Sequence, residues 1–339
     1  MRTTLKQIAE QTHLSVSIVS QVLNGKECRV SKENRALILR TAEEMDYRRN
    51  MMAVSLVKGS ANMIGLAISD IRNDFFASIA KGIEGECQRN AWNVILCNSN
   101  DRHETDMRNL RMLGDVGVSG IVWGMASDST DAMAQEGIDF MTKAKIPYLL
   151  VDRYINTNTG GIICVDHVKG GYLAAEYLLK RGHKKIVCIT GPSNLIDSRQ
   201  RLQGVKKALE KFKPDSECIV IGGKYTYQSG FDAAEEIISR RIKADAIFAF
   251  NDMMAIGAMT KLREAGIRIP EDISVIGYDD IFMDEFLEVP LTTIKQPTEK
   301  MGKCAAHNLI HGKINYKDNN QRIVFSPELI ERETVIDRH

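Results

Sequence analysis

From Met63 onward, short apolar runs alternate with amphipathic segments along the chain. The runs have the length of buried strands, and the segments repeat apolar residues at i, i+3 and i+4 as amphipathic helices do. Alternation of strand and helix predicts parallel sheets that helices cover on both faces. The expected strands are residues 64–69, 93–97, 120–123, 146–151, 185–189, 218–221, 246–250 and 273–277.

These strands fall into two sets, which predict two doubly wound parallel-sheet lobes with a cleft between them. In an open α/β sheet the ligand binds beyond the carboxyl ends of the strands, so the residues that follow each strand are candidate ligand contacts. The helices expected between the strands include residues 75–90, 169–181, 199–212, 228–240 and 253–265.

Composition narrows the class of protein. A length of 339 residues suits about two domains with a small appendage. With 44% hydrophobic and 26% charged residues, the chain is not of the disordered or low-complexity class. The sequence contains neither an apolar run of the ~18 residues that a membrane helix needs nor an N-terminal signal peptide. Seven scattered cysteines without a C-x-x-C pair indicate reduced thiols. We therefore expect a cytoplasmic protein without a metal or other cofactor.

The first sixty residues differ from the rest in charge and in pattern. They hold more Lys and Arg than Asp and Glu, whereas the remainder is mildly acidic. A small basic head is typical of a nucleic-acid-binding module, although an excess this modest decides nothing alone. The helices expected in this head follow hydroxyl caps: one after Thr4, one from Val16 to about Asn24 after Ser15, and one ending at Met45 after Ser31.

Two short helices around a tight turn form a helix-turn-helix, in which the second helix enters the major groove of DNA. Ser17 and Gln21 point outward from that helix, one turn apart. Any bundle of three helices shows a similar apolar periodicity, so the pattern indicates a DNA-binding head without proving it.

Specific motifs in the head resemble the lactose/purine-repressor (LacI/GalR) family of bacterial transcriptional regulators. They are Leu5-Lys-Gln-Ile-Ala-Glu, Leu14-Ser-Val-Ser, Val19-Ser-Gln-Val-Leu-Asn-Gly, Val30-Ser, Asp46-Tyr47 and the stretch Asn50-Met-Met-Ala-Val-Ser-Leu-Val-Lys-Gly. The last stretch resembles the hinge helix of the family, in which a leucine wedges into the minor groove, and Leu56 matches that leucine. The resemblance implies these DNA-binding residues: Ser15, Val16, Ser17, Gln21, Asn24, Ser31, Asn34, Asn50 and Leu56.

The head departs from the family pattern at four places. Gln21 stands where the family usually has Arg, and His13 replaces the usual glycine of the turn, a position that favours positive φ. The loop before Val30 is one residue longer than is common. Arg49 replaces a usual proline, so the entry to the hinge is less rigid.

The body carries matches in the same order as the family. They are Val151-Asp-Arg, Arg181-Gly-His, Arg199-Gln-Arg-Leu-Gln-Gly, Phe250-Asn-Asp, the stretch 267–280 and Pro290-Leu-Thr-Thr-Ile-Lys-Gln-Pro. The resemblance implies a body like the periplasmic sugar-binding proteins, with crossovers between lobes near Val165, Ile294 and Ser326. The expected domains are a helix-turn-helix head (1–48), a hinge (49–61) and an effector-binding and dimerisation body (62–339), whose lobe one is about 62–164 plus 295–326 and lobe two about 165–294 plus 327–339.

Polar and aromatic residues that follow the strands are the candidate effector contacts. Carboxylates, guanidinium groups and amides can bind vicinal hydroxyls, while aromatic rings cover the apolar face of a sugar. Each residue alone could equally be a loop cap, and Gly124 and Asp197 fall where relatives sometimes place polar contacts. The predicted effector-binding residues are Asp70, Phe75, Phe76, Asp152, Arg153, Asp166, Arg201, Tyr225, Asn251, Asp252, Asp279 and Gln296.

An enzyme is not expected, because the sequence contains no phosphate-binding loop, dinucleotide fingerprint or nucleophile elbow. His307 and His311 have metal-ligand spacing, but Asn308 stands where a zinc protease has its glutamate, so we expect both histidines to line a helix surface.

The resemblance implies a sequence-specific repressor of carbohydrate-utilisation genes. It would bind a pseudo-palindromic double-stranded operator as a homodimer, and a sugar-like effector between the lobes would control its affinity. Three alternatives stay open: a purine effector, a phosphoprotein corepressor, or a sugar-binding protein without a regulatory role.

Overall fold

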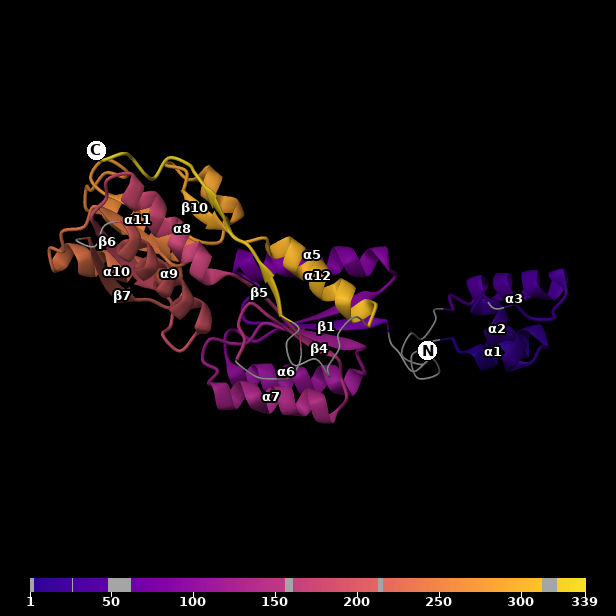
Figure 1. Ribbon diagram of the computed structural model, residues 1–339. Helices are drawn as coiled ribbons and strands as arrows, with labels where there is room; N and C mark the ends of the chain where they lie inside the picture. Colours follow the sequence, from indigo (N-terminus) through magenta and orange to yellow (C-terminus); the bar gives the residue numbers. More distant parts are fainter. Residues whose placement is uncertain (1–2, 26, 48–61, 156–160, 213–215, 313–321) are drawn as a thin grey trace. The chain divides into compact units, whose positions relative to one another are not determined.

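The computed structural model describes residues 3–25, 27–47, 62–155, 161–212, 216–312 and 322–339 (Figure 1). The chain divides into two units, Met1–Ala61 and Asn62–His339. The expected hinge, with Asn50 and Leu56, lies outside the described residues. Within the described residues, no helix is both long and apolar enough to span a bilayer.

The first unit is the expected set of helices: α1 (Leu5–Thr12), α2 (Val16–Leu23) and α3 (Lys32–Glu44). Their N-terminal caps form as predicted. Thr4 and Gln7 make both bonds of a capping box, and Ser15 and Ser31 accept hydrogen bonds from backbone N–H groups three residues on. The helices enclose a small core of Ile8, Ala9, Val19, Val22, Ile38 and Ala42.

The turn between α1 and α2 confirms the expectation for His13. This residue has φ 54°, in the left-handed region that glycine adopts at least cost. Its backbone N–H donates to carbonyl oxygens at the end of α1. His13 therefore caps the C-terminus of the helix as a glycine would, although it has a side chain. Gly25 ends the second helix in the same region, with φ 66°.

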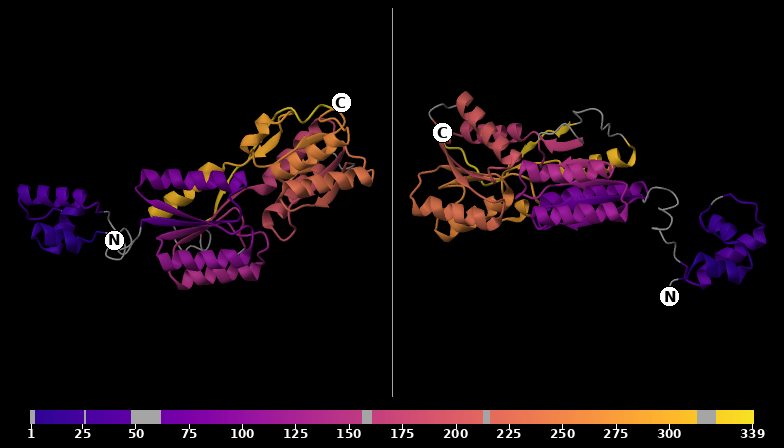
Figure 2. Two further views of the ribbon diagram at one scale, coloured as in Figure 1. Left: turned by 180° about the vertical axis from the view of Figure 1, so that it is seen from behind. Right: turned by 90° about the horizontal axis from the view of Figure 1, so that it is seen from below.

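Lobe one of the body is built on a parallel sheet with the strand order β11-β5-β4-β3-β1-β2. Helices α5 (Asp74–Arg89) and α12 (Thr298–Ile310) cover one face, and α6 (His103–Val116) and α7 (Asp131–Lys143) cover the other (Figures 1 and 2). Two apolar clusters fill the two faces. The strands are β1 (Met63–Ile68), β2 (Asn93–Asn98), β3 (Gly120–Trp123), β4 (Tyr148–Val151), β5 (Gly161–Val165) and β11 (Arg322–Phe325).

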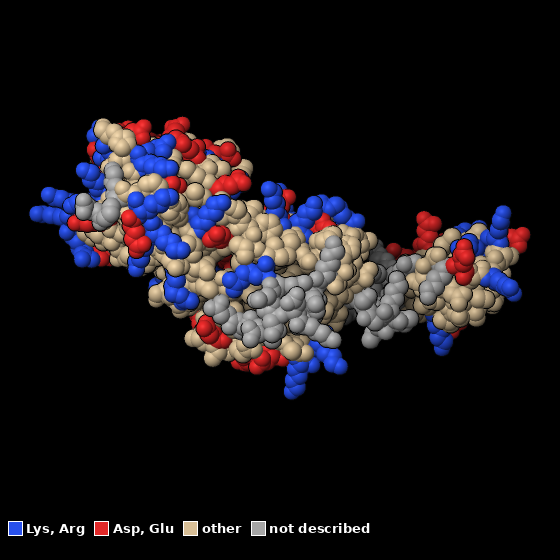
Figure 3. All heavy atoms as spheres, viewed as in Figure 1, with Lys and Arg blue, Asp and Glu red and all other residues tan. Residues whose placement is uncertain are grey.

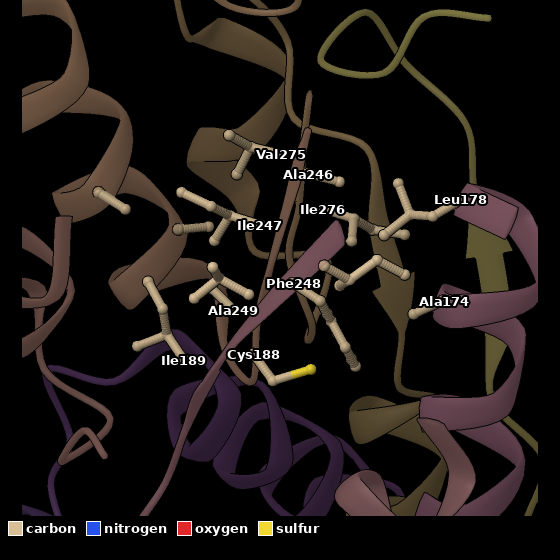
Figure 4. Packing of buried hydrophobic residues seen from close by; sticks show 14 of the residues in the cluster. Ala174, Leu178, Cys188, Ile189, Ala246, Ile247, Phe248, Ala249, Val275 and Ile276 are labelled. Carbon is tan, nitrogen blue, oxygen red and sulfur yellow. The ribbon is translucent and has the colours of Figure 1, made fainter. Parts of the chain in front are cut away.

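Lobe two repeats this plan on a smaller parallel sheet of order β7-β6-β8-β9. In its core, Cys188, Phe248 and Ile276 from the sheet lie beside Ala174 and Leu178 of α8 (Figure 4). The strands are β6 (Lys185–Thr190), β7 (Glu217–Gly222), β8 (Ala246–Ala249) and β9 (Ser274–Ile276); the helices are α8 (His167–Lys180), α9 (Ile196–Phe212), α10 (Tyr227–Ser239) and α11 (Asp252–Glu264), followed by the short 3-10 helix η1 (Phe282–Phe286).

The chain passes between the lobes at several points. It leaves lobe one after β5, returns after β10 (Thr293–Lys295), and leaves again between β11 and β12 (Glu328–Ile330), which pairs antiparallel with β10. These points lie next to Val165, Ile294 and Ser326, where crossovers were expected. The strands expected from the sequence are all present: β3 has the predicted ends and the others have ends shifted by one or more residues. Strands β5, β10, β11 and β12 were not predicted.

Candidate functional site

The carboxyl ends of strands from both lobes bring most of the predicted effector contacts together around one cavity. Its volume is about 20 Å³, which is room for roughly one water molecule, so a larger ligand requires the lobes or side chains to move. Asn73 and Asp197 also line it, although neither belongs to the predicted set. The predicted residues that line it are Phe75, Phe76, Asp152, Arg153, Arg201, Tyr225, Asn251, Asp279 and Gln296.

Three predicted effector contacts do not line the cavity. Asp70 pairs with the exposed Arg72 in its own loop (2.7 Å), and that guanidinium lowers the pKa of Asp70. Asp166 caps α8 by accepting a bond from the backbone N–H of Lys169. Both carboxylates stay outside the cavity for the same reason: a nearby N–H donor holds each one at its own turn.

Asp252 is the third correction. It is fully buried, and its carboxylate accepts bonds from the backbone N–H groups of Asp280 (2.7 Å) and Ile281 (3.2 Å) and from the hydroxyl of Thr293 (2.6 Å). It therefore ties the loop after β9 to strand β10. Asp252 organises the segment that presents Asp279, and it has no surface left for a ligand.

Arg201 occupies the centre of the lobe-two side of the cavity. It is buried, its guanidinium carbon lies 3.8 Å from the centre of the Tyr278 ring, and it donates to the backbone oxygen of Phe250. Asp197, one turn earlier on α9, lies 3.9 Å from it. The Tyr225 hydroxyl donates to Asp197 Oδ2 (2.5 Å), the same carboxylate oxygen that faces Arg201. Burial raises the pKa of Asp197, but Arg201 and other cations outweigh it and the net pKa is lowered.

Asn251 positions another residue of the site through its side-chain amide. Its side-chain oxygen caps α11 at the N–H of Met254, and its amide nitrogen donates to the backbone oxygen of Tyr225 (3.0 Å). These bonds use the amide to fix the position of the Tyr225 loop. Asn251 lines the cavity, yet its principal role in this arrangement is to position Tyr225.

Arg153 holds the lobe-one side. One guanidinium nitrogen bonds to Ser69 (3.0 Å), Asp101 (2.9 Å) and the backbone oxygen of Met125 (2.9 Å), and the group lies over the ring of Phe76. The buried guanidinium is thus anchored by its own lobe, and its Nε makes no hydrogen bond with any described residue.

Asp279 shows the strongest effect of burial on a cavity carboxylate. Desolvation, and then repulsion from Asp252, raise the pKa of Asp279 well above its ordinary value, against the opposing influence of Arg201. Its carboxylate accepts a bond from the amide of Gln296 (2.7 Å), which comes from the segment between β10 and α12. Burial therefore favours the protonated form of this carboxyl group more than it would in water.

The backbone at the cavity is strained. Asp152, Tyr225 and Asp279 have φ values of 65°, 60° and 135°, which L-residues rarely adopt. Such conformations concentrate at ligand sites, where the surrounding structure holds them. Here each one directs a side chain from a strand end or loop into the same space.

Four buried polar atoms at the cavity make no hydrogen bond with any described residue. They are Asp152 Oδ1, Asp197 Oδ1, Gln296 Oε1 and Arg153 Nε. Buried polar groups are nearly always paired, because an unpaired one costs about 1–3 kcal/mol. Three of the atoms are acceptors and one is a donor. Asp152 Oδ1 lies 3.6 Å from His167 Nε2, so Asp197 Oδ1 and Gln296 Oε1 are the acceptors left for hydroxyl or N–H donors of a ligand.

In the head, the outward face of α2 is open. Val16 is 44% exposed, Ser17 and Gln21 are exposed, and the side chains of Ser17 and Gln21 bond to no other described residue. Asn24 donates instead to Ser20 (3.1 Å). Ser31 accepts from the half-buried Asn34 and leaves its own O–H available. In Figure 3 the visible face of the head carries side chains of both charge signs.

Comparison with known proteins agrees with this architecture. Residues 4–50 match the model for bacterial regulatory proteins of the lacI family, and residues 175–335 match a periplasmic binding protein-like domain. The transcriptional repressor PurR of Vibrio atlanticus is 36% identical over 98% of both chains. This chain belongs to the LacI family.

Two solved structures resemble this chain over nearly its whole length. The lac repressor dimer bound to operator and the anti-inducer ONPF has a TM-score of 0.86 at 27% identity, covering 99% of this chain and 100% of that one. The regulator CelR in complex with cellobiose has a TM-score of 0.71 at 29% identity, covering 98% and 100%. As a LacI-family member, the protein is a DNA-binding transcriptional repressor and not an enzyme.

Two cavity residues were missed or left uncommitted in the sequence prediction. Asp197 was noted as a possible polar contact, and its i, i+4 spacing to Arg201 on one helix face is a signal that could have included it. Asn73 caps α5 through the N–H of Phe75, and only the tertiary arrangement places it beside the cavity.

Proposed function

We propose that this repressor responds to a neutral polyhydroxylated effector, a mono- or disaccharide or a related glycoside, bound in the cavity between the lobes. The unpaired acceptors Asp197 Oδ1 and Gln296 Oε1 carry this proposal, because a bound ligand can supply the donors that they lack. Sugar hydroxyls are such donors, and the rings of Phe75, Phe76 and Tyr225 can cover apolar sugar C–H groups.

The charge of the cavity supports a neutral ligand. Its lining contains the carboxyl groups of Asp152, Asp197 and Asp279 against the guanidinium groups of Arg153 and Arg201. A phosphorylated sugar would face these carboxyl groups without a matching excess of cations. The structure of CelR with cellobiose, a neutral disaccharide on the same fold, is consistent with this proposal.

A purine is the second candidate, and the PurR relatives favour it. A flat base would stack on the same aromatic rings and satisfy acceptors with its N–H edges. The two candidates differ in the number of donors that they provide: a sugar presents hydroxyls around its whole ring, whereas a purine presents few. We favour the sugar because the unpaired acceptors come from both lobes.

Control of DNA binding then follows from linkage. An effector changes operator affinity only by the free energy with which it distinguishes the two arrangements of the lobes, typically ~1–3 kcal/mol. Operator binding by the full chain, titrated with neutral sugars, sugar phosphates and purine bases, tests the proposal. We expect one neutral sugar to change operator affinity about 5- to 150-fold in either direction. A response to a purine alone would replace the sugar with the second candidate.

A homodimer is the proposed assembly, because one small head offers too little surface for specific binding to a pseudo-palindromic operator. On lobe two, Phe282, Met283 and Phe286 are exposed beside an apolar groove of about 340 Å³ lined by Ile256 and Leu287 among others. Apolar surface of this kind marks an interface. The dimeric lac repressor supports a second copy as the occupant, and sedimentation equilibrium of the full chain measures it directly.

Gln21 is proposed to read an adenine, because glutamine pairs in bidentate fashion with adenine N6 and N7 whereas arginine pairs with guanine O6 and N7. Gln21→Arg should therefore shift preference from A·T to G·C at one symmetric position in each half-site, by ~1–3 kcal/mol per contact. Selection of binding sites from random DNA with both proteins measures this.

Gln11→Arg is the matched control, since Gln11 is exposed on α1 and the substitution adds the same charge away from α2. It should strengthen binding to all DNA without changing base preference. If Gln21→Arg behaves like Gln11→Arg, Gln21 contacts phosphate or water and not a base edge.

A further inference from the structure

Helices α5 and α12 bring three potential metal ligands together at one end of lobe one. His307 and His311 lie one turn apart at the end of α12, and Glu86 lies in the last turns of α5. One ligand atom from each lies within 4.8 Å of the other two. From the sequence, these histidines were expected only to line a helix surface, since the carboxylate that completes the group is far away along the chain.

Close packing of the two helices sets this geometry. A Cβ atom on Gly82 of α5 would lie 2.2 Å from the backbone oxygen of Glu299, and one on Gly302 of α12 would lie 2.1 Å from that of Ile79. Only glycine permits such an approach of backbones. One turn beyond Gly82, the short side chain of Glu86 therefore reaches across to His307.

The carboxylate of Glu86 is held in place for a ligand role. It is buried, and one oxygen (Oε2) accepts a bond from Arg89 (2.8 Å) while the other (Oε1) lies 3.2 Å from His307 Nδ1. The hydrogen bond from Arg89 lowers the pKa of Glu86. The Arg89 bond orients the carboxylate, as hydrogen bonds to metal-binding carboxylates do. Oε1 also accepts a longer bond from the Asn90 amide (3.4 Å), which an ion bound to Oε1 would replace.

The two histidines complete the set from the solvent side. Their ring centres are 4.4 Å apart, the His307 side chain is 40% exposed, and His311 is exposed. Rings at this degree of exposure can turn to bring their nitrogens to the roughly 2.0–2.1 Å from an ion that zinc requires. Two imidazoles and one carboxylate form the donor set of many three-ligand zinc sites, with solvent at the fourth position.

We propose that Glu86, His307 and His311 form a binding site for a divalent transition-metal ion of the zinc class, which clamps α12 to α5. Imidazole and carboxylate together favour Zn²⁺, Cu²⁺ or Ni²⁺ over Mg²⁺ and Ca²⁺, which prefer all-oxygen sites. Because α12 directly follows the crossover from lobe two, the ion would secure that helix to lobe one. The site lies apart from the effector cavity and does not depend on the effector proposed above.

Calorimetric titration of chelator-treated, full-length protein with ZnCl₂ and with MgCl₂ tests the site. We expect one Zn²⁺ per chain and no measurable binding of Mg²⁺. Zn²⁺ at a hundredfold excess over its Kd should raise the melting temperature by roughly 5–10 °C. Co²⁺ in place of Zn²⁺ should give the visible absorption of a four-coordinate ion with nitrogen and oxygen ligands.

His311→Gln is the decisive variant, because His311 is exposed and its loss leaves the helix packing intact. It should weaken Zn²⁺ binding at least 10- to 100-fold and abolish the rise in melting temperature. Glu86→Gln should do the same if it folds. His339→Gln and Glu84→Gln remove an exposed imidazole elsewhere in the body and an exposed carboxylate on α5, and should leave binding unchanged. Zn²⁺ affinity equal in wild type and His311→Gln, or no Zn²⁺ binding, would overturn the proposal.

Discussion

Arg201→Ala should weaken binding of the effector by about 2–4 kcal/mol, a loss of roughly 30- to 700-fold. The guanidinium is buried between Tyr278 and Asp197 and is the main cation on the lobe-two side of the cavity. Its removal leaves the Asp197 carboxylate without its partner and withdraws charged donors from the ligand. The operator-binding panel identifies the sugar. Calorimetric titration of wild type and Arg201→Ala with that sugar then measures the loss of affinity.

The control for this prediction comes from the same helix. Arg199 is exposed and bonds to backbone oxygens of Ser193 and Asn194, so Arg199→Ala removes a guanidinium from α9 without touching the cavity. It should bind the effector as wild type does. Both variants should keep the operator affinity of wild type without effector. If Arg201→Ala retains full affinity for the sugar, the effector binds elsewhere.

Gly171→Ala should destabilise the body by about 1–3 kcal/mol or more and should also weaken effector binding. A Cβ atom at Gly171 on α8 would lie 2.0 Å from the backbone oxygen of Arg201 on α9, so one of the two helices must move. The contact is with the backbone of Arg201 itself, and relief of the clash displaces the guanidinium. Thermal unfolding and effector titration of the same sample measure the two effects.

Gly85→Ala is the matched control, because Gly85 also lies within a helix but the nearest atom to its added Cβ is 3.9 Å away. That substitution should stabilise the body by up to about 1 kcal/mol, as alanine is the better helix former. A Gly171→Ala protein as stable as wild type would show that α8 and α9 can move apart at little cost in free energy. In that case the close packing of the two helices does not determine the position of Arg201.

Local chemistry explains which parts of the fold the sequence predicted. Each cap in the head involves residues three apart, so Thr4 with Gln7 and Ser15 before α2 could be recognised without knowledge of the fold. Long apolar runs likewise marked the central strands. Strands β10, β11 and β12 have three or four residues and pair with segments far away along the chain: β11 with β5, and β12 with β10. Strand β5 is a buried apolar run of five residues that the sequence analysis missed.

The effector cavity shows the limit of the same reasoning. The sequence correctly placed polar residues after strand ends, and parallel strands carried most of them to one edge. It could not show where each carboxylate points. Asp252 and Asp279 both follow buried strands, but backbone N–H groups near β10 bind Asp252 whereas Asp279 is left facing Gln296. The hydrogen-bond donors that surround each carboxylate after folding therefore determine that Asp279 lines the cavity and Asp252 does not.

Thus the sequence alone determined the elements whose causes are local: the helix caps, the left-handed turn at His13, the alternation of strands and helices, and the open face of α2 with Gln21. The tertiary structure decided what depends on contacts between distant segments. It excluded Asp70, Asp166 and Asp252 from the cavity, added Asp197, and brought Glu86 to His307. The physical reason is that side-chain direction depends on which donor, acceptor or backbone is nearest after folding, and these neighbours are remote in the sequence.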